Sequence, residues 1–224
     1  MRISAKHLGD LALDSCERCF QIKVQLSFKL PYQVFPGIFS SIDSYSKKIT
    51  DEYYNRHGIV PPWLGIQGRP VKVPSIQQFQ WFDEETGVLL TGVPDSIIQK
   101  DDGSYAIIDY KTARYTNGQD ELLPLYRVQL NGYALIAEHN GMSPVSDLIL
   151  VYYEPFTGIK TSNVGYYIAE NGFTMLFESK TFTLEREGVH SLMRRAVEIY
   201  NSPPLEHKEG CKERQRILDF VGVL

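Results

Sequence analysis

The sequence has little of what marks a specialised class of protein. Its 224 residues include only three cysteines, too few for the disulfide framework of a small secreted domain. No apolar run approaches the roughly 20 residues that span a bilayer, and the first residues lead into no signal-type apolar segment. The net charge of −4 argues against a generally basic surface for nucleic acid. We therefore expect a cytoplasmic protein without membrane association.

The composition is otherwise ordinary for a globular protein. Hydrophobic residues make up 43% of the chain and charged residues 22%, which predicts a packed core. A chain of this length suits one α/β domain and is short for two. We therefore predict a single domain over residues 1–204, ended by Pro203-Pro204, and a polar C-terminal tail over residues 205–224.

Two β-type runs, residues 88–99 and 105–112, are joined by a short polar turn, which predicts an antiparallel hairpin. A three-residue loop, Asp101-Asp102-Gly103, would place Asp95 directly opposite Asp109, with their Cβ atoms roughly 4.5–5.5 Å apart. A two-residue loop would shift the register by one residue and send Asp95 to the other face of the sheet. We predict the three-residue loop, which brings two carboxylates together.

Lys111 shares the face of Asp109, because side chains alternate along a strand. Paired carboxylates repel unless a proton or a cation lies between them, and ligand sets made only of oxygen favour hard ions such as Mg²⁺ or Mn²⁺. The hairpin therefore predicts a metal site at Asp95 and Asp109, with Lys111 beside a metal-bound water. An isolated Asp-x-Lys is far more often a solvated ion pair, so the interpretation depends on the surrounding pattern.

A predicted helix over residues 124–138 supplies that pattern. Its apolar stripe carries one polar residue, Gln129, one turn before Tyr133. A buried glutamine needs a hydrogen-bond partner, which a phosphate, a metal-bound water or Lys111 would supply.

In order and spacing these features resemble the PD-(D/E)XK nuclease superfamily, particularly its RecB-like branch, which includes nucleases associated with CRISPR adaptation. The signature is Pro94-Asp95 and Asp109-Tyr110-Lys111, and the resemblance runs from about Leu13 to Glu154. It implies an α/β fold with a restriction-endonuclease-like core, in which a mixed central sheet is flanked by helices.

The resemblance also implies an activity and the residues that carry it. DNA, single- or double-stranded, would be the substrate, with RNA as an alternative, and a helicase or another nucleic-acid-processing protein would be a partner in a process such as DNA repair. The expected metal ligands for Mg²⁺ or Mn²⁺ are Asp95, Asp109 and the Tyr110 backbone carbonyl, and the expected catalytic residues are Lys111, which positions the attacking water, Gln129 and Tyr133.

Ser41 marks a departure from the RecB-like pattern. It lies in a helix predicted over residues 38–57, at the position where many of these nucleases have a metal-binding histidine. Asp43 could substitute, although an offset of two residues places it around the helix from Ser41. The alternative function is therefore a catalytically weakened nuclease-fold module that binds nucleic acid or a protein partner.

The cysteines form a second candidate site. Cys16 and Cys19 lie near the end of a first helix, predicted to be capped by Ser4 and to run towards Phe20, and His207 with Cys211 could complete a zinc site. The RecB-like branch often closes an iron–sulfur cluster with cysteines near the C-terminus, but three thiolates are one too few for four. We expect no metal here, with zinc and an iron–sulfur cluster as alternatives.

Further expectations concern the rest of the chain. A basic patch could gather Lys29, Lys47, Lys48 and Arg114, and a loop at 112–123 could touch substrate through Arg114, Tyr115 and Gln119. We also predict a loop at 58–74, strands at 75–82, 87–91, 145–154, 160–169 and 173–184, and a helix at 186–200.

Overall fold

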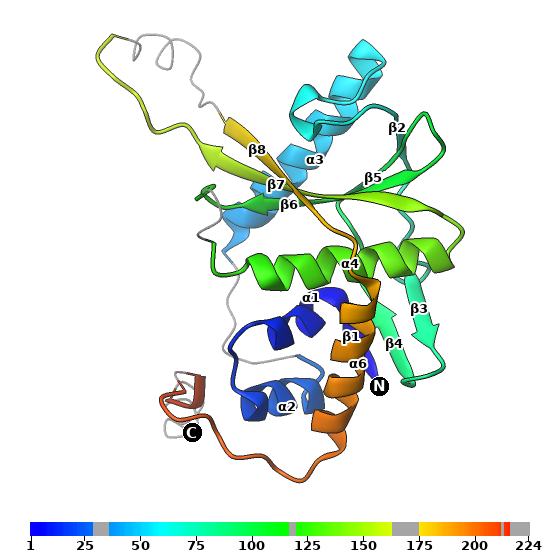
Figure 1. The fold of residues 1–224 in the computed structure, drawn as a ribbon. Coiled ribbons are helices and arrows are strands. Elements are labelled where there is room, and N and C mark those ends of the chain that lie inside the picture. Colours follow the sequence, from blue (N-terminus) through cyan, green and yellow to red (C-terminus); the bar gives the residue numbers. More distant parts are fainter. Residues whose placement is uncertain (29–35, 117–119, 163–174, 212, 216–224) are drawn as a thin grey trace.

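The computed structural model describes residues 1–28, 36–116, 120–162, 175–211 and 213–215, in which helices cover both faces of a mixed sheet (Figure 1). The sheet has five strands in the order β2-β5-β6-β7-β8. β6 and β7 are parallel, and the other neighbours are antiparallel. The strands are β2 (Arg69–Val71), β5 (Ser96–Gln99), β6 (Tyr105–Thr112), β7 (Val145–Pro155) and β8 (Met175–Phe182). The predicted α/β class, a mixed sheet flanked by helices, is confirmed.

The helices lie in layers on either side of this sheet. α3 packs on one face and α4 on the other, while α1, α2 and α6 form a further layer beyond α4 (Figure 1). None of the helices in the described ranges is long and apolar enough to cross a membrane. The helical segments are α1 (Ala5–Leu8), η1 (Gly9–Ala12), α2 (Glu17–Gln25), α3 (Gly37–His57), η2 (Pro62–Leu64), α4 (Leu123–His139) and α6 (Arg186–Asn201).

The core lies on both faces of the central strand β6. Ile107 packs towards α4 with Leu148 and Leu150, whereas Ile108 and Tyr110 pack on the opposite face. α4 is itself enclosed between the sheet and the outer helices, so that every residue from 128 to 137 is buried. The alternation of β6 therefore directs its odd-numbered side chains towards α4.

The turn between β5 and β6 has the predicted three-residue loop. The Lys100 amide donates to Ser104 O at 2.8 Å, and the Gly103 amide donates to Lys100 O at 3.0 Å. Gly103 has φ +84°, a conformation that glycine adopts without strain. The ladder pairs Ser96 with Ile108, so the predicted register of the hairpin is confirmed.

The ladder ends one residue short of the acidic pair. The Asp95 amide donates to Ile108 O at 3.1 Å, so Asp95 lies beyond β5 and is not cross-strand paired with Asp109. The expected strand over residues 88–99 is also wrong, because Gly92, at φ +152°, and Pro94 interrupt it. A Cβ on Gly92 would lie 2.4 Å from a ring carbon of Tyr133, so the chain turns here against α4.

The part of that run before Gly92 belongs to a second, three-stranded sheet in the order β1-β4-β3. The sequence did not predict β1, which pairs in parallel with β4, and the strand expected over 75–82 begins only at Gln80. The strands are β1 (Arg2–Ser4), β3 (Gln80–Asp83) and β4 (Val88–Thr91).

Other boundaries differ from expectation. Ser4 does cap a helix, accepting from the His7 amide at 3.2 Å, but the expected first helix is broken into α1, η1 and α2. Gly9 lies at this break, where a Cβ would be 2.7 Å from Leu125 O of α4. The loop expected over 58–74 contains η2 and the edge strand β2.

The strand expected over residues 160–169 and the expected C-terminal tail lie partly outside the described residues. Of the strand expected over 160–169, only 160–162 are described, and they are not in a strand. Lys29 and Gln119 lie outside the described residues, as do 212 and 216–224 of the expected tail. The start of that tail packs on α2, where the Leu205 amide donates to Gln21 Oε1 at 3.1 Å. The division into a domain and a tail stays a prediction.

Candidate active site

A pocket of about 500 Å³ opens where β6 meets α3 and α4. The side chains that the sequence singled out on the hairpin and on α4 all border it, together with groups from α1 and α3. Its charged and polar lining comprises Lys6, Ser40, Asp43, Asp95, Asp109, Lys111, Tyr126, Gln129 and Tyr133.

Asp109 is the most deeply buried acid of the pocket, with 4% of its surface exposed. Its Oδ1 accepts from Gln129 Nε2 at 3.1 Å, and its Oδ2 lies 2.5 Å from Lys111 Nζ. Burial raises the pKa of the Asp109 carboxyl to about 6; the Lys111 charge opposes this shift and the nearby Asp95 charge adds to it. Apart from the Lys111 ammonium, Oδ2 has no hydrogen-bond partner within the described residues, so it has lone pairs left for a cation.

Lys111 is held on three sides. Its ammonium contacts Asp109, donates to Gln129 Oε1 at 3.2 Å and lies 4.8 Å from the centre of the Tyr126 ring. An ammonium has three N–H donors, and two are used by Asp109 and Gln129. The third is available to a ligand in the pocket.

Gln129 connects Lys111 to Tyr133. Its Nε2 donates to Asp109 Oδ1 and to Tyr133 Oη at 2.7 Å, while its Oε1 accepts from Lys111. The buried glutamine expected from the sequence thus has partners of its own chain. Burial raises the pKa of the Tyr133 hydroxyl, so Tyr133 keeps its proton and can donate it in a hydrogen bond.

Asp95 faces the pocket from the chain segment before β5. Its Oδ2 accepts from the Tyr110 amide at 2.7 Å, and its Oδ1 lies 2.7 Å from Lys47 Nζ. Lys47 also contacts Asp43 Oδ2 at 2.8 Å, so one ammonium bridges two carboxylates. Although burial alone would lower the pKa of Lys47, hydrogen bonds to Asp43 and Asp95 raise it.

α3 presents a different face to the pocket from the one expected. Ser41 is exposed and its hydroxyl donates to Gly37 O at 3.4 Å, whereas Ser40 and Asp43 line the pocket. Tyr45 is 53% exposed, because α3 packs on the sheet through Ser46 and Thr50. Asp43, and not Ser41, is therefore the carboxylate that α3 presents to the pocket.

Tyr110 borders the pocket through its backbone. Its ring lies on the opposite face of the sheet, where its hydroxyl is 3.0 Å from Thr50 Oγ1. Tyr110 nevertheless lines the pocket, so its main chain must provide that contact. The use of its carbonyl as a metal ligand stays a prediction.

Three charged or aromatic side chains at or beside the pocket were not assigned to this site from the sequence. Lys6 reaches the pocket from α1, and Tyr126 lies one turn before Gln129. Lys47, expected only in a basic patch, does not line the pocket but contacts two of its acids. The spacing of Asp43 and Lys47, one helical turn apart, could have indicated their pairing. Nothing local could have indicated that this pair meets Asp95.

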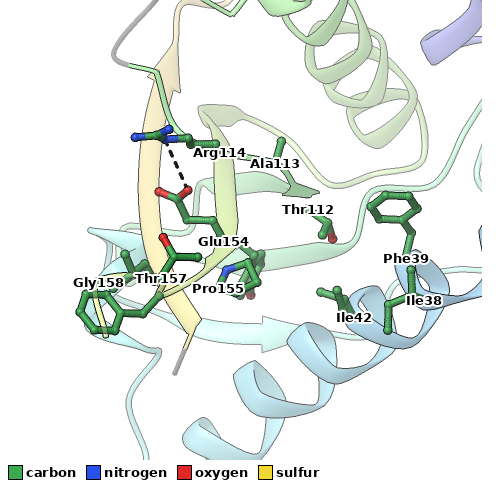
Figure 2. A pocket seen from close by; sticks show the side chains of 13 residues that line it. Ile38, Phe39, Ile42, Thr112, Ala113, Arg114, Glu154, Pro155, Thr157 and Gly158 are labelled. Carbon is green, nitrogen blue, oxygen red and sulfur yellow. Dashed lines mark ion pairs between the residues drawn. The ribbon is translucent and has the colours of Figure 1, made fainter. Parts of the chain in front are cut away.

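A second hollow, of about 680 Å³, adjoins the acidic pocket and shares Phe39, Thr112 and Ala113 with it. Figure 2 shows Phe39 and Ile42 on α3 facing Thr112 across this hollow. Arg114, of the expected substrate loop, pairs with Glu154 at 3.9 Å on its rim. The hollow extends the site along the end of β6 with mainly apolar walls.

The donor set fits a hard divalent cation. Three carboxylates, Asp43, Asp95 and Asp109, border one pocket, and oxygen ligands of this kind suit Mg²⁺ or Mn²⁺. Two features favour positive charge in this pocket. Asp109 has lone pairs left to accept a cation, and the Lys47 ammonium already bridges Asp43 and Asp95.

The second candidate site also assembles. Cys16, Cys19, His207 and Cys211 offer ligand atoms that all lie within 4.8 Å of one another. All three cysteines are free thiols. The expectation that they bind no metal stays untested, but the four side chains that the sequence grouped do converge.

The chain has similarities to known proteins. The family model described as the PD-(D/E)XK nuclease superfamily matches residues 65–216, more than half of the chain. The chain is also similar to the crystal structure of SSO0001, with a TM-score of 0.42 and 15% identity, over 91% of this chain and 79% of that one. No curated protein matches the sequence. The chain belongs to the PD-(D/E)XK nuclease superfamily.

Proposed function

We propose that this protein is a nuclease that hydrolyses phosphodiester bonds of DNA, with Mg²⁺ or Mn²⁺ held by Asp95 and Asp109. The observation that carries the proposal is the meeting of these carboxylates with Lys111 in one pocket. A divalent ion at this place would polarise the phosphoryl oxygen and lower the pKa of a bound water. Membership of the superfamily implies a nucleic-acid substrate.

Lys111 positions the attacking water in this proposal. Its contacts with Asp109 and Gln129 hold the ammonium in place and leave one N–H group to donate to a ligand in the pocket. A water or phosphate oxygen that accepts this hydrogen bond is held against the acidic pair. Lys111 is therefore the residue whose loss should most reduce hydrolysis without removing the metal ligands.

Gln129 and Tyr133 have separate roles. Both N–H groups of the Gln129 amide donate within the chain and its oxygen accepts from Lys111, so Gln129 acts as a positioning residue for Lys111 and Asp109. The Tyr133 hydroxyl accepts from Gln129 and has its own hydrogen free to donate to a phosphate oxygen. This Gln-x-x-x-Tyr arrangement also supports assignment to the RecB-like branch.

The adjoining hollow supports a nucleic-acid strand as substrate. It runs from the acidic pocket along apolar walls that include Phe39 (Figure 2). Bases stack on aromatic side chains without sequence preference, so an unpaired strand could lie here while its phosphate reaches the metal. RNA is the alternative substrate.

A second candidate function is a nuclease-fold module that binds nucleic acid or a protein without cleaving. Two observations favour it: the Lys47 ammonium bridges Asp43 and Asp95 where a cation would bind, and Ser41 points away from the pocket. In this case the lysine would be a permanent substitute for the metal.

The test is cleavage of end-labelled single- and double-stranded DNA, and of RNA, with Mn²⁺, with Mg²⁺ and with a chelator. We expect metal-dependent DNA cleavage that falls by about 10²- to 10⁴-fold in Lys111→Ala. Lys72→Ala is the matched control, because Lys72 is an exposed lysine outside both the pocket and the expected basic patch. Cleavage that survives Lys111→Ala contradicts the mechanism, and no cleavage together with no Mn²⁺ binding at millimolar metal favours the second candidate.

A further inference from the structure

We propose that Cys16, Cys19, His207 and Cys211 bind one Zn²⁺ ion that joins the start of α2 to the chain after α6. This site is separate from the acidic pocket, none of whose lining residues it contains. Its two halves come from opposite ends of the sequence, with Cys19 and Cys211 separated by 192 positions. Their convergence is a property of the fold and not of a local motif.

The spacing of the ligand atoms suits a single tetrahedral ion. Zn–S bonds of about 2.3 Å and Zn–N bonds of about 2.0 Å place two sulfurs about 3.8 Å apart, and a sulfur and a nitrogen about 3.5 Å apart. Cys16 Sγ and Cys19 Sγ each lie 3.6 Å from His207 Nδ1. Cys19 Sγ lies 3.4 Å from Cys211 Sγ. The other pairs of ligand atoms lie within 4.8 Å, so shifts of up to about 1 Å would complete the site.

Each half of the site has a local structural cause. Cys16 is the N-cap of α2 and Cys19 lies in its first turn, so the spacing of three residues brings both thiols to the same end of the helix. His207 and Cys211 flank a turn in which the Cys211 amide donates to Lys208 O at 3.2 Å. Gly210, at φ +68°, allows the chain to reverse there.

The two halves are held together by contacts that do not involve the proposed ligands. Gln21 of α2 is fully buried, and its Nε2 donates to Ile199 O and Ser202 O, both at 3.0 Å. Lys23 pairs with Glu213 at 2.8 Å. The ligands are thus brought together before any ion binds, which favours metal affinity because less chain must be ordered on binding.

The donor set and distances favour zinc over an iron–sulfur cluster. In a [4Fe–4S] cluster each ligand binds a different iron, and in a [2Fe–2S] cluster the four ligands are divided between two irons, so in either case the full ligand set is spread more widely than around one ion. Here all four ligand atoms lie within 4.8 Å, and a set of three cysteines and one histidine is a typical structural zinc site. The Lys208 amide also donates to Cys16 Sγ at 3.3 Å, as expected for a supporting hydrogen bond to a metal thiolate.

With four protein ligands the site has no open position for substrate, so its role is structural. It ties α2 to the chain that follows α6, in the layer of helices packed beneath α4. Because α4 carries Gln129 and Tyr133, this layer supports the acidic pocket from behind. The proposal does not depend on nuclease activity.

The experiment is elemental analysis of full-length protein purified without added chelator, together with acid-labile sulfide. We expect about one zinc per chain and no stoichiometric iron or sulfide. His207→Ala should retain less than about a tenth of the zinc, and His207→Cys should retain it fully, because a fourth thiolate replaces the imidazole. His207 lies on the partly exposed tail, so both variants should fold.

The double variant Asp95→Asn, Asp109→Asn is the matched control and should keep its zinc, which distinguishes this site from the acidic pocket. Reloading the chelated protein with Co²⁺ should give the visible absorption of a tetrahedral ion with thiolate ligands. Stoichiometric iron with sulfide, zinc unaffected by His207→Ala, or no bound metal in folded protein would each overturn the proposal.

Discussion

Replacing Lys47 by methionine should tighten Mn²⁺ binding to the acidic pocket. The Lys47 ammonium lies 2.7 Å from Asp95 Oδ1 and 2.8 Å from Asp43 Oδ2, so a cation that uses these oxygens must displace it. Methionine keeps the length and apolar stem of the side chain while removing its charge. The variant therefore removes a competitor from the site without opening a cavity.

The size of the effect follows from the exposure of these ion pairs. The Lys47 side chain is 38% exposed, and ion pairs in contact with solvent contribute roughly 0.2–1 kcal/mol each. Breaking two of them costs about 0.5–2 kcal/mol, which corresponds to roughly a 2- to 30-fold change in Kd at 1.4 kcal/mol per tenfold.

Isothermal titration of Mn²⁺ into wild type, Lys47→Met and Lys48→Met measures this change. Lys48 is the next residue on α3, is exposed and makes no ion pair with any described residue, so it controls for the loss of one positive charge. Binding to Lys47→Met that is no tighter than to Lys48→Met would refute the reasoning, since Lys47 would then not compete with the metal.

Three further predictions concern the same pocket. Burial raises the pKa of Asp109 to about 6 from 3.8 in the unfolded chain, so metal-free wild type loses stability as pH rises from about 4 to 6. Across that window the free energy of unfolding of Asp109→Asn should rise by about 3 kcal/mol relative to that of wild type, measured by urea denaturation with chelator. Parallel pH profiles of the two proteins would contradict this. Gln129→Leu should lower the single-turnover cleavage rate by about 10²-fold while changing Mn²⁺ affinity by less than about threefold, because it misplaces Lys111 without removing a metal ligand. Equal losses of cleavage rate and Mn²⁺ affinity would argue that Gln129 is itself a ligand. Gly92→Ala should destabilise the fold by about 2–4 kcal/mol, because the added Cβ meets the Tyr133 ring. Gly58 also has a positive φ, but its added Cβ meets nothing within 4 Å, so Gly58→Ala should lose only about 1 kcal/mol in the same denaturation assay. Equal losses in the two variants would contradict the clash.

The hairpin and α4 could be predicted from the sequence because their signals are local. A three-residue turn ending in Gly103 fixes the register of β5 and β6, and strand alternation then places Asp109 and Lys111 on one face. Helical spacing places Gln129 and Tyr133 on the buried face of α4. In each case the deciding residues lie within a few positions of one another.

The parts that could not be predicted depend on which distant elements meet. Helical periodicity gives α3 an amphipathic face but does not orient it, so Lys47 and Asp43 were not linked to Asp95. The break before Asp95 depends on Gly92 passing the Tyr133 ring, which lies on another element. The convergence of Cys16 with His207 was expected only through the resemblance to the RecB-like branch, because no local signal near Cys16 indicates that the chain after α6 returns to it.

The central claim is that Asp95 and Asp109 hold a divalent cation. The most direct test is the anomalous difference density of crystals soaked in Mn²⁺. We predict a peak within about 2.5 Å of carboxylate oxygens of both residues, with the Lys47 ammonium displaced from Asp95. The account is contradicted if no peak forms there at millimolar Mn²⁺ and Lys47 still bridges Asp43 and Asp95.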